Sequence, residues 1–378
     1  MYIDNLVLDK NGDWKYVSNG IEKKENTDIV FVFGDTDVIK NRDIFHKIKN
    51  TYPNAHIVGS SSSGNILGKE ISKNSLVMTA VEFESSKVEV HSVDFIKGDT
   101  LERLSSELVE KLSKEGLKHV FVLSDGLKVN GSELVRGMNT SLQGIHVTGG
   151  LAGDGARFQE TFVISDDEAK ESRIAAIGFY GENLKISSGC FGGWSEFGTY
   201  RTITRSEGNV LYEIDGEPAL DLYKRYLGEY ASDLPNSGLR FPLSIKKESD
   251  DPEIIRTLLA IDEDEKSITF AGDVPEGYSA RLMKPDIDKL IDGAGKAANE
   301  ITVANSKPAL GLVVSCVGRK IVLGQLIDEE LEEVGDILGN NINLVGFYSY
   351  GEIAPFEKDK MKCELHNQTM TLTAIYED

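Results

Sequence analysis

The feature that most constrains this chain is a structural unit that recurs along it. A run of apolar and β-branched residues ends in a polar residue (IVFVFGD), and a helix-like segment and a second short strand follow it. The segments are 29–35, 43–53 and 56–60 in the first copy and 119–126, 132–142 and 146–150 in the second. The two copies keep the same spacing throughout. A fixed internal period is typical of proteins built from repeated supersecondary units.

Downstream of each copy, apolar and polar residues alternate in a pattern that predicts a β-hairpin, at 75–95 and at 173–191. A third copy ends the chain, with strand-like segments at 310–316, 343–353 and 370–377 and a helix-like segment at 328–339. Strands and helices in this order indicate sheets with helices on an outer face. We therefore predict an α/β fold of the α+β type, with mixed β-sheets, outer helices and repeated strand-helix-strand-hairpin units.

Composition excludes several classes of protein. The chain of 378 residues is long enough for two or three domains. Its formal net charge of -21 repels a phosphate backbone, so nucleic acid is not an expected partner. Its three cysteines show no C-x-x-C spacing, so we expect neither a disulfide framework nor a metal site.

The sequence also bears on location. It begins without the basic and apolar segments of a secretory leader, and it has no run of about 18 apolar residues. An odd number of cysteines without a pairing pattern suits a reducing compartment. We expect a cytoplasmic protein that does not enter a membrane.

A serine-rich loop follows the second strand of the first copy. The string VGSSSSGNI (58–66) corresponds to VGFYSYGEI (345–353) in the third copy, and both glycines are kept. The loop lacks the lysine placement of a phosphate-binding loop and the central serine of a nucleophile elbow. We interpret it as the lip of a pocket, where Ser61 and Ser62 face a ligand while Ser60 and Ser63 allow close packing.

The glycine-rich string of the second copy, GGLAGDGARF (149–158), matches a dinucleotide fingerprint only loosely. We predict a turn whose glycines adopt positive φ. Asp154 and Arg157 would then be polar groups of its wall.

Several long strings in this chain resemble the FIST family. They include VGSSSSGNI, HVTGGLAGDGARF, DGEPALDLYKRYLG, VVSCVGRK, GFYSYGEIAP and LHNQTMTL, in this order. The resemblance implies an N-terminal hairpin at 1–27, a FIST N-terminal domain at 28–212 and a FIST C-terminal domain at 213–378. We place the boundary near the amphipathic segment at 213–230.

The resemblance also implies a function. FIST proteins are regarded as intracellular sensory modules of signal transduction, proposed to bind small ligands such as amino acids. The implied partners are a histidine kinase, a chemotaxis protein or a cyclic-dinucleotide signalling protein. Some FIST-like proteins are described as haem-based nitric oxide sensors, which leaves haem open as an alternative cofactor.

The C-terminal copy holds the richest set of polar residues. We expect its strand-end loops to meet at one end of a single sheet and to form a pocket. Arg319 or Arg256 would bind the carboxylate of an amino acid, and Glu352 its ammonium group. The alternatives are a structural ion pair between Arg319 and Glu352 and an amide that holds a loop backbone. The predicted ligand-binding residues are Arg256, Cys316, Arg319, Tyr350, Glu352, Asn367, Ser61 and Ser62.

The cysteines and histidines also bear on catalysis and on haem binding. Cys316 with His366 as base would make a cysteine nucleophile, but a lone cysteine at a strand end also serves packing. The sequence has no C-x-x-C-H motif, and no histidine can be assigned as a haem ligand. We expect a binding protein without catalytic residues, metal or resident cofactor.

Overall fold

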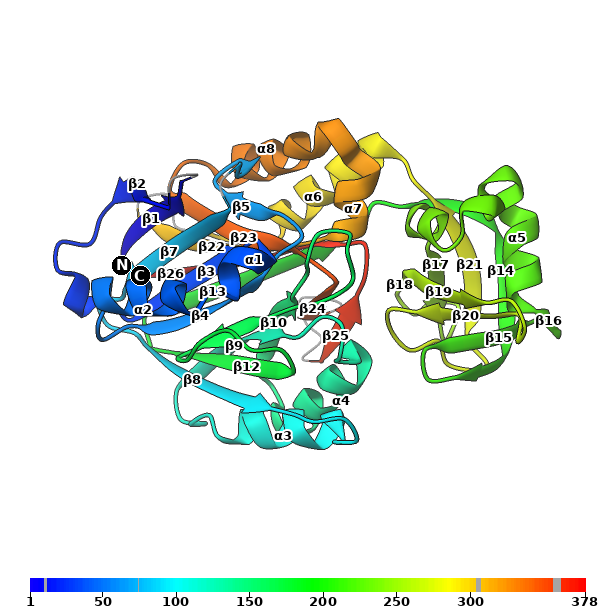
Figure 1. The fold of residues 1–378 in the computed structure, drawn as a ribbon, viewed down its shortest axis with the longest axis horizontal. Coiled ribbons are helices and arrows are strands. Elements are labelled where there is room, and N and C mark those ends of the chain that lie inside the picture. The colour runs from blue at the N-terminus through cyan, green and yellow to red at the C-terminus, as the bar shows by residue number, and fades with distance from the viewer. Residues whose placement is uncertain (10–11, 74, 304–306, 356–361) are drawn as a thin grey trace.

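The chain has a large body and a smaller inserted part. The computed structural model describes residues 1–378 except 10–11, 74, 304–306 and 356–361. Residues 1–194 and 285–378 form the body, around three sheets, and residues 195–284 form the inserted part, around a fourth (Figure 1). Mixed sheets with helices confirm the predicted fold class.

Three six-stranded sheets make up the body. The first sheet has the order β11 (Val163–Ser165), β4 (His56–Ser61), β3 (Ile29–Gly34), β7 (Leu76–Glu82), β1 (Tyr2–Leu8), β2 (Trp14–Asn19). The second has the order β25 (Cys363–His366), β24 (Gly351–Pro355), β10 (His146–Leu151), β9 (Leu117–Ser124), β12 (Arg173–Tyr180), β8 (Lys87–Asp94). The third has the order β13 (Leu184–Phe191), β26 (Met370–Glu377), β22 (Ala309–Cys316), β23 (Ile342–Ser349), β5 (Asn65–Leu67), β6 (Glu70–Ile71).

Each of these sheets is built around one parallel pair, β3 with β4, β9 with β10 and β22 with β23. The predicted hairpins, however, are not paired strands. β7 lies between β3 and β1 in the first sheet, while the next strand, β8, pairs with β12 in the second. In the same way β12 lies in the second sheet and β13 pairs with β26 in the third. Alternation predicts strands, but it does not say which sheet edge each strand will join.

The inner faces of the three sheets share one core. Along β3, Ile29, Phe31 and Phe33 point into it, while the residues between them point to the outer face. The Phe33 ring stacks on Phe347 of β23 at 4.8 Å, and Phe31 meets Phe121 of β9 edge-on at 6.1 Å. Aromatic contacts between strands of different sheets therefore fix how the sheets pack together.

Helices cover the outer faces. They are α1 (Thr36–Ile39), α2 (Arg42–Thr51), α3 (Leu101–Glu110), α4 (Gly131–Ser141), α6 (Ile287–Asn299), α7 (Val317–Leu323) and α8 (Ile327–Leu338). α3 packs beside α4 outside the second sheet, and α6 packs on α8 outside the third (Figure 1). Among the helices of the described residues, none is long and apolar enough to cross a membrane.

The inserted part has its own core. Its sheet has the order β18 (Ile254–Arg256), β17 (Leu243–Lys246), β21 (Ser279–Lys284), β14 (Ser195–Glu207), β15 (Val210–Ile214), β20 (Ser267–Phe270), β19 (Leu258–Asp262), and β16 (Glu217–Pro218) pairs with β15. α5 (Ala219–Leu227) packs against this sheet and buries Leu220 and Tyr223. The boundary predicted at residue 213 lies within β15.

A glycine lets the two strands of each parallel pair approach closely. A Cβ atom on Gly59, Gly149 or Gly346 would lie about 2 Å or less from a carbonyl oxygen of the neighbouring strand. For Gly346 that oxygen belongs to Val313, at 1.8 Å. The glycines of β4, β10 and β23 therefore have a steric reason to be glycine.

We expect Gly346→Ala to lower the free energy of unfolding by roughly 2 kcal/mol or more, because the two strands must move apart. Urea unfolding measures the change. Gly192→Ala is the matched control, since a Cβ there lies 3.6 Å from its nearest neighbour and should cost under about 0.5 kcal/mol. Equal losses in the two variants would contradict the steric explanation.

Candidate functional site

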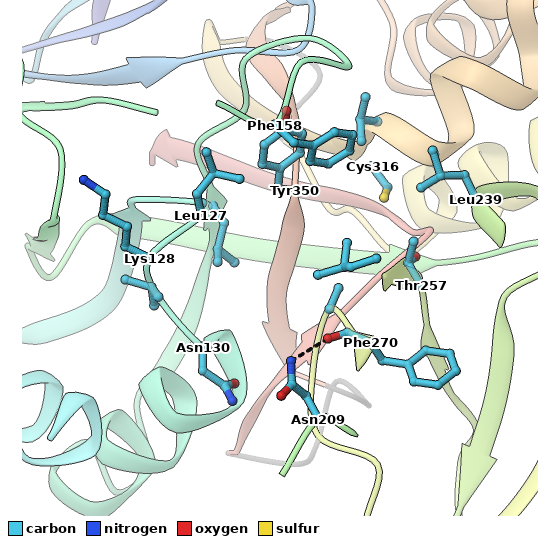
Figure 2. A pocket seen from close by; sticks show the side chains of 17 residues that line it. Leu127, Lys128, Asn130, Phe158, Asn209, Leu239, Thr257, Phe270, Cys316 and Tyr350 are labelled. Carbon is cyan, nitrogen blue, oxygen red and sulfur yellow. Dashed lines mark hydrogen bonds between the residues drawn. The ribbon is translucent and has the colours of Figure 1, made fainter. Parts of the chain in front are cut away.

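A cavity of about 270 Å³ lies between the body and the inserted part (Figure 2). From the body, the loop at 126–130 after β9, the ends of β10 and β22 and the residue after β23 line it. The inserted part adds Asn209, Leu239, Thr257, Leu259, Phe270 and Ala271. We call this space the interdomain cavity. Clefts at domain interfaces and at the carboxyl ends of strands are common ligand sites.

Two stacked rings form one wall. The ring of Phe158 lies 4.6 Å from that of Tyr350, with an angle of 12° between the planes (Figure 2). The Tyr350 hydroxyl donates hydrogen bonds to the carboxylate of Asp154 and to the carbonyl of Gly155, at 3.0 Å in the second case. Burial and the Asp154 carboxylate raise the pKa of Tyr350. The ring therefore stays neutral and offers a flat apolar surface.

The polar wall contains one hydroxyl without a partner. Thr257 is 4% exposed, and its Oγ1 has no hydrogen-bond partner among the described residues. Its backbone N–H donates to Oδ1 of Asn367 at 3.2 Å, which fixes the residue at the cavity wall. Leaving a buried hydroxyl unsatisfied costs about 1 to 3 kcal/mol. A bound polar group at this place would remove that cost.

Amides and an ammonium complete the lining. Asn209 Nδ2 donates to the carbonyl of Phe270 at 2.8 Å (Figure 2). Asn130 caps α4 by accepting from Ser132 N, and its Nδ2 donates to Asp273. Lys128 forms an exposed ion pair with Glu171 at 2.9 Å. In Figure 2 the Lys128 ammonium points away from the other labelled side chains of the cavity.

Polar contacts join the two parts around the cavity. Arg256 of the inserted part donates to the carbonyl of Leu365 in β25, at 2.9 Å, and Arg136 of α4 pairs with Asp273 at 2.6 Å. Gln368 Nε2 donates to the carbonyl of Leu239 at 3.0 Å. Two chain connections also join the inserted part to the body (Figure 1).

The predicted grip on an amino acid is not formed. Arg319 is fully buried and pairs with Glu330 of α8 at 2.7 Å, instead of with Glu352. Its guanidinium also donates to backbone carbonyls of Gly192 and Leu290. The alternative, an ion pair of Arg319 with Glu352, is wrong, because the identity of an ion-pair partner depends on which helix packs over β22.

Glu352 is buried elsewhere, in the second sheet. Its carboxylate accepts from Ser349 Oγ and from both N and Oγ1 of Thr369, at 3.1 and 3.0 Å. Burial raises its pKa to about 8, although these hydrogen bonds oppose the rise. Cys316 ends a strand of the third sheet, so the predicted loops meet between two sheets and not at the end of one.

Of the eight predicted ligand residues, Cys316 and Tyr350 line the interdomain cavity. Arg256 and Asn367 bond the two parts beside it. Ser61 Oγ accepts from Phe162 N, and Ser62 lines a second cavity. Ser62 and Cys316 thus contact different spaces.

The structure gives little support to a cysteine nucleophile. Burial raises the pKa of the Cys316 thiol well above its ordinary value, and burial lowers the pKa of His366 to about 4. A thiolate paired with an imidazolium needs a lowered thiol pKa and a raised imidazole pKa, which is the opposite of both shifts.

The positions of the described side chains also bear on metal and haem binding. In the described part of the chain, no group of three His, Cys, Asp or Glu side chains is placed to hold a metal ion. The described lining of the interdomain cavity contains Cys316 and no histidine. A protonated thiol is a poor axial ligand, so these residues do not fit haem.

Apart from Cys316 and Tyr350, the described lining of the interdomain cavity was not predicted from the sequence. Asn209, Thr257 and Phe270 lie in strands or turns that carry no motif, and the loop at 126–130 looks like an ordinary helix cap. Ser124 ends β9 and Asp125 follows it, and this pair in the repeat is the signal that could have pointed to this loop.

Comparison with known proteins covers most of the chain. A family model for the FIST N domain matches residues 28–217, and one for the FIST C domain matches residues 219–355. An uncharacterized protein of Methanocaldococcus jannaschii is 23% identical over 92% of this chain and 73% of its own. An uncharacterized protein of Mycobacterium tuberculosis is 23% identical over 83% of this chain and 82% of its own.

A solved structure of cyanuric acid hydrolase from A. caulinodans also aligns. It covers 94% of this chain and 91% of its own, with a TM-score of 0.38 and 8% identity. A TM-score this low supports no inference about fold or activity.

Glu352 should make stability depend on pH. Its pKa is near 4.5 when unfolded and about 8 when folded, so the folded state holds an extra proton between these values. Stability should fall as pH rises through this window, on the order of 1 kcal/mol per pH unit. Urea unfolding from pH 5 to 8.5 should show this slope in the wild type and lose it in Glu352→Gln. Parallel curves for both would contradict the buried, protonated carboxyl.

Arg319→Met should lower the free energy of unfolding by about 3 to 5 kcal/mol, because Glu330 remains buried without its counter-charge. The double variant Arg319→Met with Glu330→Gln should recover part of the loss, since no buried charge is then left unpaired. Chemical denaturation of both variants measures this. A single-variant loss under about 1 kcal/mol would show that the pair does not hold α8 on the sheet.

Proposed function

Because the chain belongs to the FIST family, whose FIST N and FIST C domains are sensory domains of signal transduction, we propose that it senses a small polar metabolite bound in the interdomain cavity. The ligand binds without chemical change. We place the protein in the cytoplasm, where it reports occupancy to a partner.

The observation that carries this proposal is the Thr257 hydroxyl. It is buried in the wall of a cavity that the two parts of the chain share, and it has no partner among the described residues. A ligand that bonds this hydroxyl removes the free-energy cost of a buried hydroxyl without a hydrogen bond. Its binding therefore favours the arrangement in which the inserted part stays against the body.

The lining supports an amino acid with an apolar side chain. Leu127, Leu239 and Leu259, with the stacked Phe158 and Tyr350, offer apolar surface for that side chain. The Thr257 hydroxyl accepts from the ammonium group, and Lys128 supplies the cation for the carboxylate once its ammonium group turns from Glu171 into the cavity. This set replaces the Arg319 and Glu352 grip expected from sequence.

The position of the ligand between the two parts of the chain suggests how binding is signalled. A ligand in the interdomain cavity touches the loop after β9 and the inserted part together, so occupancy changes how firmly the two are joined. The family resemblance suggests a histidine kinase, a chemotaxis protein or a cyclic-dinucleotide protein as the partner.

A thermal-shift screen with the twenty amino acids tests the proposal. A ligand at about 100 times its dissociation constant should add roughly 2.7 kcal/mol of stability. Thr257→Val should weaken the binding about tenfold, because it removes one hydrogen bond to a charged group.

The matched control is Thr27→Val. Thr27 also has a buried Oγ1 without a partner among the described residues, but it lies before β3 and outside the described lining of the cavity. Removing the Thr27 hydroxyl should leave the affinity for the ligand unchanged. If no amino acid shifts the melting temperature, or if both variants weaken binding equally, the proposal is wrong.

A further inference from the structure

A second cavity, of about 410 Å³, lies on the body and is lined by a different set of residues. It is formed where α1 follows β3, where the serine-rich loop follows β4 and where the loop at 154–157 follows β10. Lys320 of α7 lines it as well. We call it the serine-loop cavity. The inserted part contributes no residue to its described lining.

Lys320 brings a partly desolvated ammonium group to this cavity. Its Nζ donates to the carbonyl of Ser63 and lies 5.9 Å from the centre of the Tyr348 ring. Burial lowers the pKa of Lys320, and the nearby Asp35 carboxylate opposes this shift. An ammonium group has three N–H donors, and Ser63 is its one hydrogen-bond acceptor in the described structure. Donors therefore remain for a ligand.

Thr36 gives a second and independent indication. It lines the serine-loop cavity, is 2% exposed, and its Oγ1 has no hydrogen-bond partner among the residues that the structure describes. As in the interdomain cavity, this hydroxyl is left to bond a bound water or a ligand group.

The carboxylates around the cavity are not equivalent. Asp154 is saturated, since it accepts from Tyr350 Oη and from the backbone N–H groups of residues 158–160. Asp37 pairs with Lys40 at 2.7 Å. Asp35 Oδ1 accepts from Asn65 at 3.2 Å, and its second oxygen has no described partner. One acid thus remains able to accept a hydrogen bond.

The donors in the lining are therefore Lys320, Thr36, Lys73 and Arg157, whose Nε already donates to the Asp154 carbonyl, and Asp35 has an oxygen left to accept. Lys320 and Thr36 suit a carboxylate, and Asp35 suits a hydroxyl or an ammonium next to it. A bare carboxylate would meet Asp35 as a like charge. We propose that the serine-loop cavity binds a small carboxylic acid that carries a hydroxyl or ammonium group beside the carboxylate.

This site does not depend on the proposed sensor site. The interdomain cavity offers apolar walls to a side chain, whereas the serine-loop cavity offers charged groups to a compact polar acid. The two cavities are linked through one loop, because Asp154 lines this cavity and Phe158 the other.

Calorimetry on the full chain tests the proposal with three probes: L-lactate, L-serine and propionate. Lactate and serine should bind, and propionate should bind at least about tenfold more weakly, because it has no donor for Asp35. Asp35→Asn should abolish this difference and raise the affinity for propionate, since the like charge is gone.

Two further variants locate the site. Lys320→Met should weaken lactate binding about tenfold or more, because a charged hydrogen bond is lost. Thr36→Val should weaken it several-fold without destabilising the protein, since the hydroxyl has no partner to lose. If Lys320→Met unfolds the chain, Thr36→Val still gives a decisive result.

Thr257→Val and Thr27→Val are the controls. Both should leave lactate binding unchanged, and Thr257→Val would weaken amino-acid binding only at the interdomain cavity. The proposal is overturned if lactate does not bind at millimolar concentration, if propionate binds as tightly as lactate, or if Thr36→Val has no effect on lactate binding.

Discussion

The shared core between three sheets is the constraint on which the rest of this structure depends. None of these three sheets, as described, is assembled from one stretch of chain, since each combines a parallel pair with strands from other parts of the sequence. The contacts of Phe31 with Phe121 and of Phe33 with Phe347 join strands of all three sheets. Burying those faces requires all three at once, because a single unit leaves its inner face exposed to water.

This packing also determines where ligands can bind. The carboxyl ends of all three parallel pairs converge, and their loops line both cavities. The loop at 154–160 lies between the two spaces, with the Asp154 carboxylate held by Tyr350. One hydrogen-bonded loop thus contributes residues to both cavities.

The candidate site shows how far residue chemistry can be read from sequence. Cys316 and Tyr350, two of the predicted ligand residues, both line the interdomain cavity, and polar or reactive residues at strand ends commonly face a cavity. Arg319 and Glu352 were both recognised as notable, yet each has a different partner from the one expected. Charge type identifies a group that needs a partner, but only packing decides which partner is within reach.

The sequence by itself determined the strands and the outer helices, because hydrophobic period is a local property. Only the tertiary structure decided which sheet β8 and β13 join, and it alone brought Thr257 of the inserted part against the loop after β9. Strand exchange and the interdomain cavity both depend on contacts between distant segments. Both are stabilised by burying surfaces of distant segments against each other, so the sequence of one segment does not predict them.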